Sequence, residues 1–420
     1  MRPSNVRASI VILCLLGLFA IFSSTMSKSP ILPYFARDLG ASEVELGIIA
    51  AASTIPGIIA SFPAGLASDI WAKRILLIVS CLFFALTPFL YFLVRTPLQL
   101  TLVRFAHGFA TAILGPVALA MVARKYLSRR GEMMGYYSSS TYIGRLAAPV
   151  AGGAILSSSI VFVAGTSTFM SIYLICGISG FLALLFALLI PHKNSSQIEP
   201  DAAMRPRNLT RSLRELFTNR LIMTTAVMEA VQYFSFGAIE FFLPLFWSDK
   251  LGLDETQIGI QMGIMLTTIV AVLLLTNPLM GRLSDRFSRK PFIYSGLFIC
   301  GLSLILLPLI PDLLTGGILV ALYGLGMSAN TASTSAFISD LAKKEQYGAA
   351  IGITKTIMDI GQALGPITFG IVLTITIRNY LIGFLFVSSV LFLAVALFLG
   401  VVRTTKAKAV SNSENNIDAD

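Results

Sequence analysis

The sequence predicts an all-α integral membrane protein with twelve transmembrane helices in two pseudo-symmetric six-helix bundles. The composition, the number of long apolar runs and an internal repeat lead to this prediction. Of the 420 residues, 55% are hydrophobic and 12% are charged, whereas a soluble domain carries about 25% charged residues. Most of the chain therefore faces lipid or other helices rather than water.

Twelve apolar runs are long enough to cross a bilayer, which takes ~20 residues. The runs cover residues 9–35, 44–67, 75–94, 97–123, 134–158, 167–190, 219–247, 257–280, 291–311, 313–339, 347–376 and 379–402. The first run has no clear small-residue cleavage site, so we assign it to a transmembrane helix rather than to a signal peptide.

The second half of the chain repeats the first. Four residues recur at a constant offset: Gly135, Gly144, Pro149 and Gly153 return as Gly352, Gly361, Pro366 and Gly370. The segment 32–40 at the end of the first run also resembles 243–252 at the end of the seventh. A repeat of six spans is typical of transporters whose two bundles surround a site at the middle of the membrane.

Polar segments divide the chain into four parts. We predict an N-terminal bundle over 1–191, a basic cytoplasmic linker over 192–218, a C-terminal bundle over 219–402 and a disordered cytoplasmic tail over 403–420. The linker is rich in arginine and proline and is expected to include a short surface helix. The tail has little apolar surface to bury.

Basic residues gather in the loops on one side of the predicted membrane. The net charge is +10, yet only Arg37, Arg95, Lys250 and Arg378 fall in the opposite loops. The positive-inside rule then places both termini in the cytoplasm. The expected location is the plasma (inner) membrane. The basicity reflects this topology, so we expect a lipid bilayer and no nucleic acid as partner.

A short polar motif occurs at matching places in both halves. It reads Gly65-Leu-Ala-Ser-Asp-Ile-Trp-Ala-Lys-Arg74 in the first copy and Gly281-Arg-Leu-Ser-Asp-Arg-Phe-Ser-Arg-Lys290 in the second. The motif resembles the loop between helices 2 and 3 of the major facilitator superfamily of secondary transporters, Gly-x-x-x-Asp-Arg-x-Gly-Arg-Lys, which returns in weaker form between helices 8 and 9. The alternative is an ordinary polar loop with positive-inside charges.

The resemblance implies a gating role for the residues that match the family motif. These are Gly65, Asp69, Lys73 and Arg74 in the first copy and Gly281, Asp285, Arg286, Arg289 and Lys290 in the second. Ile70, Ala72 and Ser288 depart from the motif, which leaves the second copy the more complete one.

Ionisable side chains inside the apolar runs mark transport pathways or paired sites, because each costs ~2.5–3.5 kcal/mol or more at a helix centre. They are Lys28, Arg104, Arg145, Glu229, Glu240, Lys355 and Asp359. None lies in runs 3, 6, 9 or 12, which agrees with the peripheral position of these helices in the family.

Two pairs stand out among these charges. Lys28 and Glu240 occupy nearly equivalent positions of the repeat, so we expect an ion pair or a substrate clamp across the central axis. Lys355 and Asp359 lie one helical turn apart and are expected to face the cavity. A purely structural pair is the alternative for the first, and mutual neutralisation for the second.

The expected substrate cavity combines these lysines with the fifth helix. The repeat puts Ser138 and Tyr142 opposite the Lys355 pair, and Arg145 lies at mid-depth, where it could meet an anionic group. The predicted cavity residues are Lys28, Ser138, Tyr142, Arg145 and Lys355.

Proton coupling needs a group whose pKa changes with its environment. Glu240 and Asp359 are the first candidates and Glu229, which has no local partner, is the third. Arg104 and His107 belong to a segment that resembles the helix 4 motif of proton-coupled family members, in which the arginine is linked to proton transfer. His107 could add a group that titrates near neutral pH, but a lone histidine is more often a hydrogen-bonded core residue.

The fifth helix carries a signal for the direction of transport. Its segment Gly144-Arg-Leu-Ala-Ala-Pro-Val-Ala-Gly-Gly153 resembles the helix 5 motif of drug:proton antiporters. Small residues let helices approach closely and proline bends a helix, so a tight seam is expected at Gly144, Ala148, Pro149, Gly152 and Gly153. Ordinary small-residue packing is the alternative.

The resemblance implies proton-coupled efflux of small, amphipathic molecules by alternating access. The expected protein is a monomer driven by the proton gradient, with no cofactor, no metal and no enzymatic activity. An importer or symporter of a small solute with the same fold remains open. A membrane receptor or enzyme has little support, because the short loops hold no nucleophile triad, paired carboxylates or metal motif.

Overall fold

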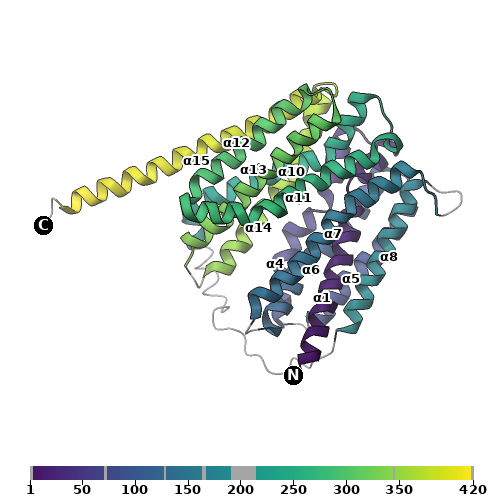
Figure 1. Cartoon of the computed structure of the whole chain (residues 1–420), viewed down its shortest axis with the longest axis horizontal. Coiled ribbons are helices and arrows are strands. Elements are labelled where there is room, and N and C mark those ends of the chain that lie inside the picture. The colour runs from purple at the N-terminus through teal and green to yellow at the C-terminus, as the bar shows by residue number, and fades with distance from the viewer. Residues whose placement is uncertain are drawn as a thin grey trace. The chain divides into compact units, whose positions relative to one another are not determined.

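The computed structural model describes residues 3–70, 73–126, 129–162, 167–190, 214–343 and 346–417. Over these ranges all regular structure is helical, as predicted (Figure 1). The first half contains α1 (Pro3–Met26), α2 (Ile31–Asp38), α3 (Glu43–Ala52), α4 (Ile55–Ile70), α5 (Lys73–Leu90), α6 (Pro97–Lys125), α7 (Arg130–Ser158) and α8 (Thr168–Leu189). The second half contains α10 (Arg220–Leu251), α11 (Glu255–Phe287), α12 (Arg289–Leu306), α13 (Leu313–Leu341), α14 (Tyr347–Ile375) and α15 (Tyr380–Ile417).

Contacts between Cα atoms divide the chain into two units. Unit 1 consists of Met1–Pro200, Phe236–Ala271 and Gln362–Tyr380, and unit 2 consists of Asp201–Ser235, Val272–Gly361 and Leu381–Asp420. Unit 1 thus combines the first predicted bundle with parts of α10, α11 and α14. Each of these three helices continues into unit 2.

Eleven candidate spans in the described chain are long and apolar enough to cross a membrane. The predicted span 134–158 is the exception. It forms α7, which has 29 residues but carries Ser138, Tyr142 and Arg145. A helix of this length with polar side chains at mid-depth needs protein or water rather than lipid along one side.

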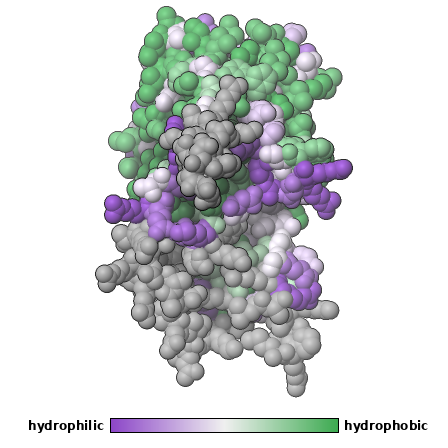
Figure 2. All heavy atoms as spheres, turned by 90° about the vertical axis from the view of Figure 1, so that its left-hand side faces the viewer, coloured by the Kyte–Doolittle hydropathy of each residue, from purple (hydrophilic) through white to green (hydrophobic). Residues whose placement is uncertain are grey.

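Large apolar side chains are exposed along most of the other helices, including Leu93, Leu275, Leu314 and Leu393. Figure 2 shows apolar side chains over much of one face, bordered by hydrophilic side chains. Such a surface suits a hydrocarbon environment, in which exposed apolar side chains carry no penalty.

Two of the predicted spans are broken helices. Residues 27–30 form a turn between α1 and α2, and residues 53–54 separate α3 from α4. The first break ends with Pro30 and the second lies shortly before Pro56. A proline ring disfavours helical backbone at the preceding residue and removes a backbone donor. Each of these runs, 9–35 and 44–67, was expected to form a single span.

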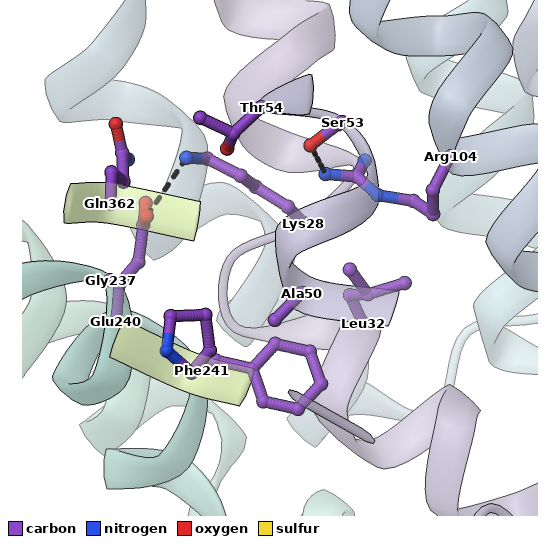
Figure 3. Close-up of a pocket in the computed structure, with 11 residues that line it drawn as sticks. Lys28, Leu32, Ala50, Ser53, Thr54, Arg104, Gly237, Glu240, Phe241 and Gln362 are labelled. Carbon is purple, nitrogen blue, oxygen red and sulfur yellow. Dashed lines mark hydrogen bonds and ion pairs between the residues drawn. The ribbon is translucent and has the colours of Figure 1, made fainter. Parts of the chain in front are cut away.

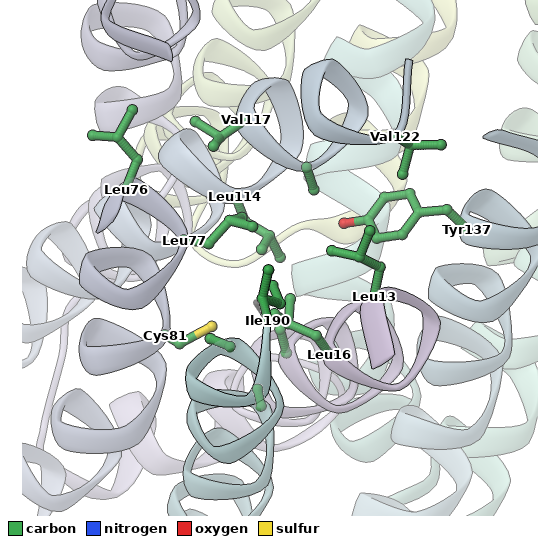
Figure 4. Close-up of a cluster of buried hydrophobic side chains, with 14 of the residues drawn as sticks. Leu13, Leu16, Leu76, Leu77, Cys81, Leu114, Val117, Val122, Tyr137 and Ile190 are labelled. Carbon is green, nitrogen blue, oxygen red and sulfur yellow. The ribbon is translucent and has the colours of Figure 1, made fainter. Parts of the chain in front are cut away.

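Apolar side chains from α1, α5, α6 and α7 form a core in unit 1 (Figure 4). Leu16, Leu77 and Val117 are fully buried, and Tyr137 is 4% exposed. Lipid is as apolar as these side chains, so close packing rather than exclusion of water stabilises the contact.

Glycines bring helices from the two halves of the chain together within unit 1. A Cβ atom at Gly153 of α7 would collide with the carbonyl oxygen of Gly259 on α11, and one at Gly263 with that of Pro149. A Cβ at Gly47 of α3 would likewise collide with α14. Backbones this close require residues without side chains.

The other predicted seam residues lie along the same helix. Gly144 faces the backbone of α1, with 2.5 Å between a Cβ built on it and the carbonyl oxygen of Leu18. Gly152 faces Ile31 of α2, and Ala148 is fully buried. The seam therefore faces α1, α2 and α11.

Helix α15 differs from the prediction at its end. It continues to Ile417, although residues 403–420 were predicted to form a disordered tail. Lys and Ala are good helix formers, and residues 403–409 contain no proline or glycine to end the helix. Most of the predicted linker lies outside the described residues, but 214–218 are helical.

Replacing Gly153 by alanine is expected to disrupt the contact between α7 and α11. The added Cβ would meet backbone, which cannot rotate away, and overpacking of this kind costs ~1–3 kcal/mol. Gly135→Ala is the matched control on the same helix, because a Cβ there meets nothing within 4 Å. The thermal midpoint in detergent should fall for Gly153→Ala only, and equal midpoints for the two variants would contradict the close contact.

Candidate functional site

The two helix breaks meet at a small pocket in unit 1 (Figure 3). Lys28 comes from the turn between α1 and α2, and Ser53 and Thr54 come from the break between α3 and α4. The lining residues are Lys28, Leu32, Ala50, Ser53, Thr54, Arg104, Gly237, Glu240, Phe241, Gln362 and Pro366. The volume that the centres of water molecules can occupy in this cavity is about 30 Å³. The cavity therefore has room for very few waters.

The predicted ion pair between Lys28 and Glu240 is confirmed. The Lys28 Nζ lies 2.8 Å from Oε2 of Glu240, and the two side chains are 27% and 17% exposed. The positive charges of Arg145 and Arg104 also act on the Lys28 ammonium group. Lys28 therefore lies among two further cations and one carboxylate.

Arg104 of α6 connects the two helix breaks. It is 2% exposed, and its guanidinium donates to the Ser53 hydroxyl at 2.6 Å and to the Ser27 and Tyr91 hydroxyls at 3.3 Å each. All three acceptors are neutral, and the Nε group has no partner. Among the described residues no carboxylate forms a salt bridge with this buried cation.

His107, one turn after Arg104, lies in the core. Its Nδ1 atom is 3.3 Å from the Tyr91 hydroxyl, and its ring packs edge-on against Phe84. The side chain is 2% exposed and is not among the residues that line the pocket. This environment fits the interpretation of His107 as a hydrogen-bonded core residue.

The remaining predicted cavity residues lie in separate units. Ser138 and Tyr142 on α7 in unit 1 are half-buried, and Arg145 is exposed. In unit 2, Lys355 donates to Asp359 at 2.6 Å, with the lysine side chain 54% exposed and the aspartate 7% exposed.

Glu229 lies in a polar cluster between α10 and α13 in unit 2. Its carboxylate accepts hydrogen bonds from Thr331 at 3.1 Å, Thr334 at 2.5 Å and Asn330 at 3.3 Å. The side chain is 4% exposed, and no described cation forms a salt bridge with it. These three partners on α13 were not predicted, because the span 313–339 contains no charge. The polar run from Ser328 to Thr334 was the available signal.

The first copy of the predicted gating motif is only partly described. The side chains of Gly65 and Asp69 lie outside the described residues. Lys73 and Arg74 begin α5, and Arg74 donates to the carbonyl oxygen of Leu188 at 2.9 Å. This arginine therefore caps the end of α8, where carbonyl groups lack helical partners.

The second copy forms a charged cluster in unit 2. Arg289 pairs with Asp285 of the same motif and, at 3.1 Å, with Asp340 of α13. The Arg286 guanidinium lies 5.6 Å from the Phe287 ring centre, and the Lys290 ammonium 5.9 Å from that of Phe337. A Cβ built on Gly281 meets nothing within 4 Å.

Two further ion pairs in unit 1 were not predicted. Arg37 at the end of α2 forms two hydrogen bonds, 2.6 and 2.9 Å long, with Asp249 of α10, and Tyr380 donates to the same carboxylate at 2.8 Å. Glu43 of α3 pairs with Arg378 at 2.5 Å. In the sequence, Arg37 and Arg378 counted only as two of the few basic residues in the loops opposite the cytoplasmic side.

Comparisons with known proteins agree with this architecture. The family model described as Major Facilitator Superfamily matches residues 13–273 and 225–416. The chain is 26% identical over 351 residues to an uncharacterized MFS-type transporter of Methanocaldococcus jannaschii, covering 81% of this chain and 85% of the relative. It is 25% identical over 388 residues to Multidrug resistance protein 2 of Bacillus subtilis, covering 90% and 92%.

A solved structure shares the fold. The crystal structure of a bacterial homolog to the human lysosomal transporter Spinster, in an inward-facing and unoccupied conformation, superposes with a TM-score of 0.79. The alignment covers 96% of this chain and 98% of that chain at 14% identity. At this identity the likeness concerns the fold alone.

The Lys28–Glu240 pair is expected to show strong energetic coupling. Glu240→Gln leaves the Lys28 cation without its carboxylate, which costs more than loss of the pair as a whole. The double variant Lys28→Met/Glu240→Gln should recover part of the stability, with a coupling energy of ~0.5–3 kcal/mol. Unfolding of the four proteins in detergent measures it, and additive effects would show that the pair is energetically unimportant.

Proposed function

Because the chain belongs to the Major Facilitator Superfamily, whose members are membrane transporters of small molecules, we propose that it exports small amphipathic molecules in exchange for protons. The pocket at the helix breaks carries this proposal. One side of it holds Lys28, Glu240 and Arg104, and the other holds Leu32 and Phe241 (Figure 3). A molecule with a polar and an apolar end complements both sides.

The export direction is supported by two observations. Multidrug resistance protein 2, a relative over 90% of this chain, is named for resistance. The fifth-helix motif resembles that of drug:proton antiporters, and its residues Gly153 and Pro149 meet Gly259 and Gly263 of α11 at backbone distance. A contact this tight suits a seal against leakage of protons.

Glu229 is our first choice for the proton carrier. Glu43, Glu229 and Asp359 are the buried acidic side chains in the described chain, and Arg378 and Lys355 pair with the first and the third. Glu229 instead meets hydroxyl groups, which donate to a charged carboxylate and accept from a neutral carboxylic acid. Its surroundings therefore suit both protonation states, as a carrier requires.

The distribution of basic loops supports an orientation with both termini in the cytoplasm. In this orientation the Arg37–Asp249 and Glu43–Arg378 pairs lie toward the outer surface, beyond the pocket. They hold ends of α2 and α3 to the second half of the chain. Within unit 1 the outer path to the pocket is thus the closed one.

Transport with proteoliposomes tests the direction. The two probes are 4-phenylbutanesulfonate and 4-phenylbutyltrimethylammonium, which share the phenylbutyl group and carry a permanent charge. Weak acids and bases would redistribute passively across the membrane with the pH gradient, whereas these probes do not. An antiporter accumulates at least one of them when the lumen is made acidic, and lumenal pyranine reports the matching loss of protons. Probe movement out of the acidic lumen would indicate symport and contradict the proposal.

The proton carrier is tested with three amide variants. Glu229→Gln should reduce probe-dependent proton movement at least tenfold while probe binding is retained. Glu240→Gln and Asp359→Asn are compared in the same assay, and Glu132→Gln, at an exposed position, is the control. Undiminished proton movement in all three variants would exclude antiport through these carboxylates.

A further inference from the structure

We propose that the pocket in unit 1 binds the anionic head of the transported molecule, so that the substrates are anionic amphiphiles. This inference rests on the proposed function in one respect, the assignment of the pocket to the substrate. The head group that we propose is a carboxylate or a similar small oxyanion. Three observations on unit 1 carry the inference: the charges around the pocket, the burial of Arg104, and the size and apolar wall of the cavity.

The charges around the pocket do not balance. Lys28 and Arg104 line the pocket, and the charge of Arg145 reaches Lys28. Glu240 is the one carboxylate among the lining residues, and Lys28 already binds it at 2.8 Å. The two lining cations therefore share a single carboxylate, and Arg145 adds positive charge from outside the lining.

Arg104 is a buried cation at the edge of the cavity, not a surface charge. Its side chain is 2% exposed, it borders the cavity, and its Nε group lacks any partner. A buried cation that has only hydroxyl partners is costly in a medium of low polarity. An arriving anion would offset this cost.

The size and the apolar wall define the rest of the ligand. With about 30 Å³ available to the centres of water molecules, the cavity can hold a head group but not a whole substrate in this conformation. Leu32 and Phe241 form an apolar wall of the pocket (Figure 3), and Pro366 is a further apolar lining residue. An apolar body attached to the anionic head would extend along this wall. A cationic amphiphile would meet repulsion from Lys28 and Arg104.

Three probes that share one body test the inference: 4-phenylbutyrate, 4-phenylbutanol and 4-phenylbutylamine. Binding to the full-length protein in nanodiscs is measured by calorimetry without a proton gradient, so neither the direction of transport nor proton coupling affects it. We expect 4-phenylbutyrate to bind at least tenfold more tightly than the alcohol, and the amine to bind most weakly. Sodium acetate is included to separate a free anion from the head of an amphiphile.

Arg145→Gln and Arg104→Gln are the test variants. Arg145 is exposed, so its replacement should leave folding intact and lower the affinity for 4-phenylbutyrate at least fivefold without weakening the amine. Arg95→Gln, an exposed arginine in a loop, is the matched control and should bind like the wild type. If Arg104→Gln does not fold, Arg145→Gln still decides the question.

Three results would overturn the inference. The amine could bind more tightly than the carboxylate. Arg145→Gln could bind 4-phenylbutyrate as the wild type does. Acetate could bind as tightly as 4-phenylbutyrate, which would indicate an inorganic anion site unconnected with an amphipathic substrate. Failure of proton-driven transport with these binding results intact would instead contradict the export proposal.

Discussion

The burial of Arg104 without a carboxylate is the constraint on which the architecture of unit 1 depends. A guanidinium has five donors and no acceptor, and within a membrane it must find oxygen atoms. Ser27 and Ser53 supply two of them, and both residues lie where a helix stops. The helix breaks and the arginine thus depend on each other: the breaks bring hydroxyls to the guanidinium, and the guanidinium holds two polar breaks together inside the protein.

Glycines fix the second half of the chain against these breaks. Gly47 on α3 and Gly370 on α14 would each collide, as alanine, with backbone of the opposing helix. Because α3 ends at the break that contains Ser53, its contact with α14 also sets the distance from Ser53 to Gln362. Backbone packing therefore sets the dimensions of the pocket. A larger residue in place of Gly47 or Gly370 should change these dimensions, although neither glycine lines the pocket.

Much of the fold could be predicted from hydrophobicity and the internal repeat. The repeat also predicted that Lys28 and Glu240 meet, although they are far apart in the chain. The breaks were missed because each run stays apolar on both sides of only two to four polar residues. Ser27-Lys-Ser-Pro30 and Ser53-Thr-Ile-Pro56 are the signal that was available: small hydroxyl residues shortly before a proline, where the helix is weakest.

The neutral hydrogen-bond partners of the buried charges could not be predicted from the sequence either. A membrane charge is visible in a sequence, but its hydroxyl and amide partners look like ordinary small residues until the helices are packed. Asn330 and Thr334 around Glu229 could not have been assigned from composition, and neither could Tyr91 beside Arg104. The positions of charges were therefore predictable, whereas the balance between charged and neutral partners required the structure.

That balance bears on how a substrate could drive the cycle. A ligand shifts a conformational equilibrium only by the difference in its affinity for the two states. A bare anion fits the cavity as it stands and so favours the conformation described here. An anion with an apolar body meets the same cations but finds room for its head alone, so a conformation with a wider pocket would bind it better. The body, and not the charge, then distinguishes the two states, while the charge decides which molecules enter the pocket at all.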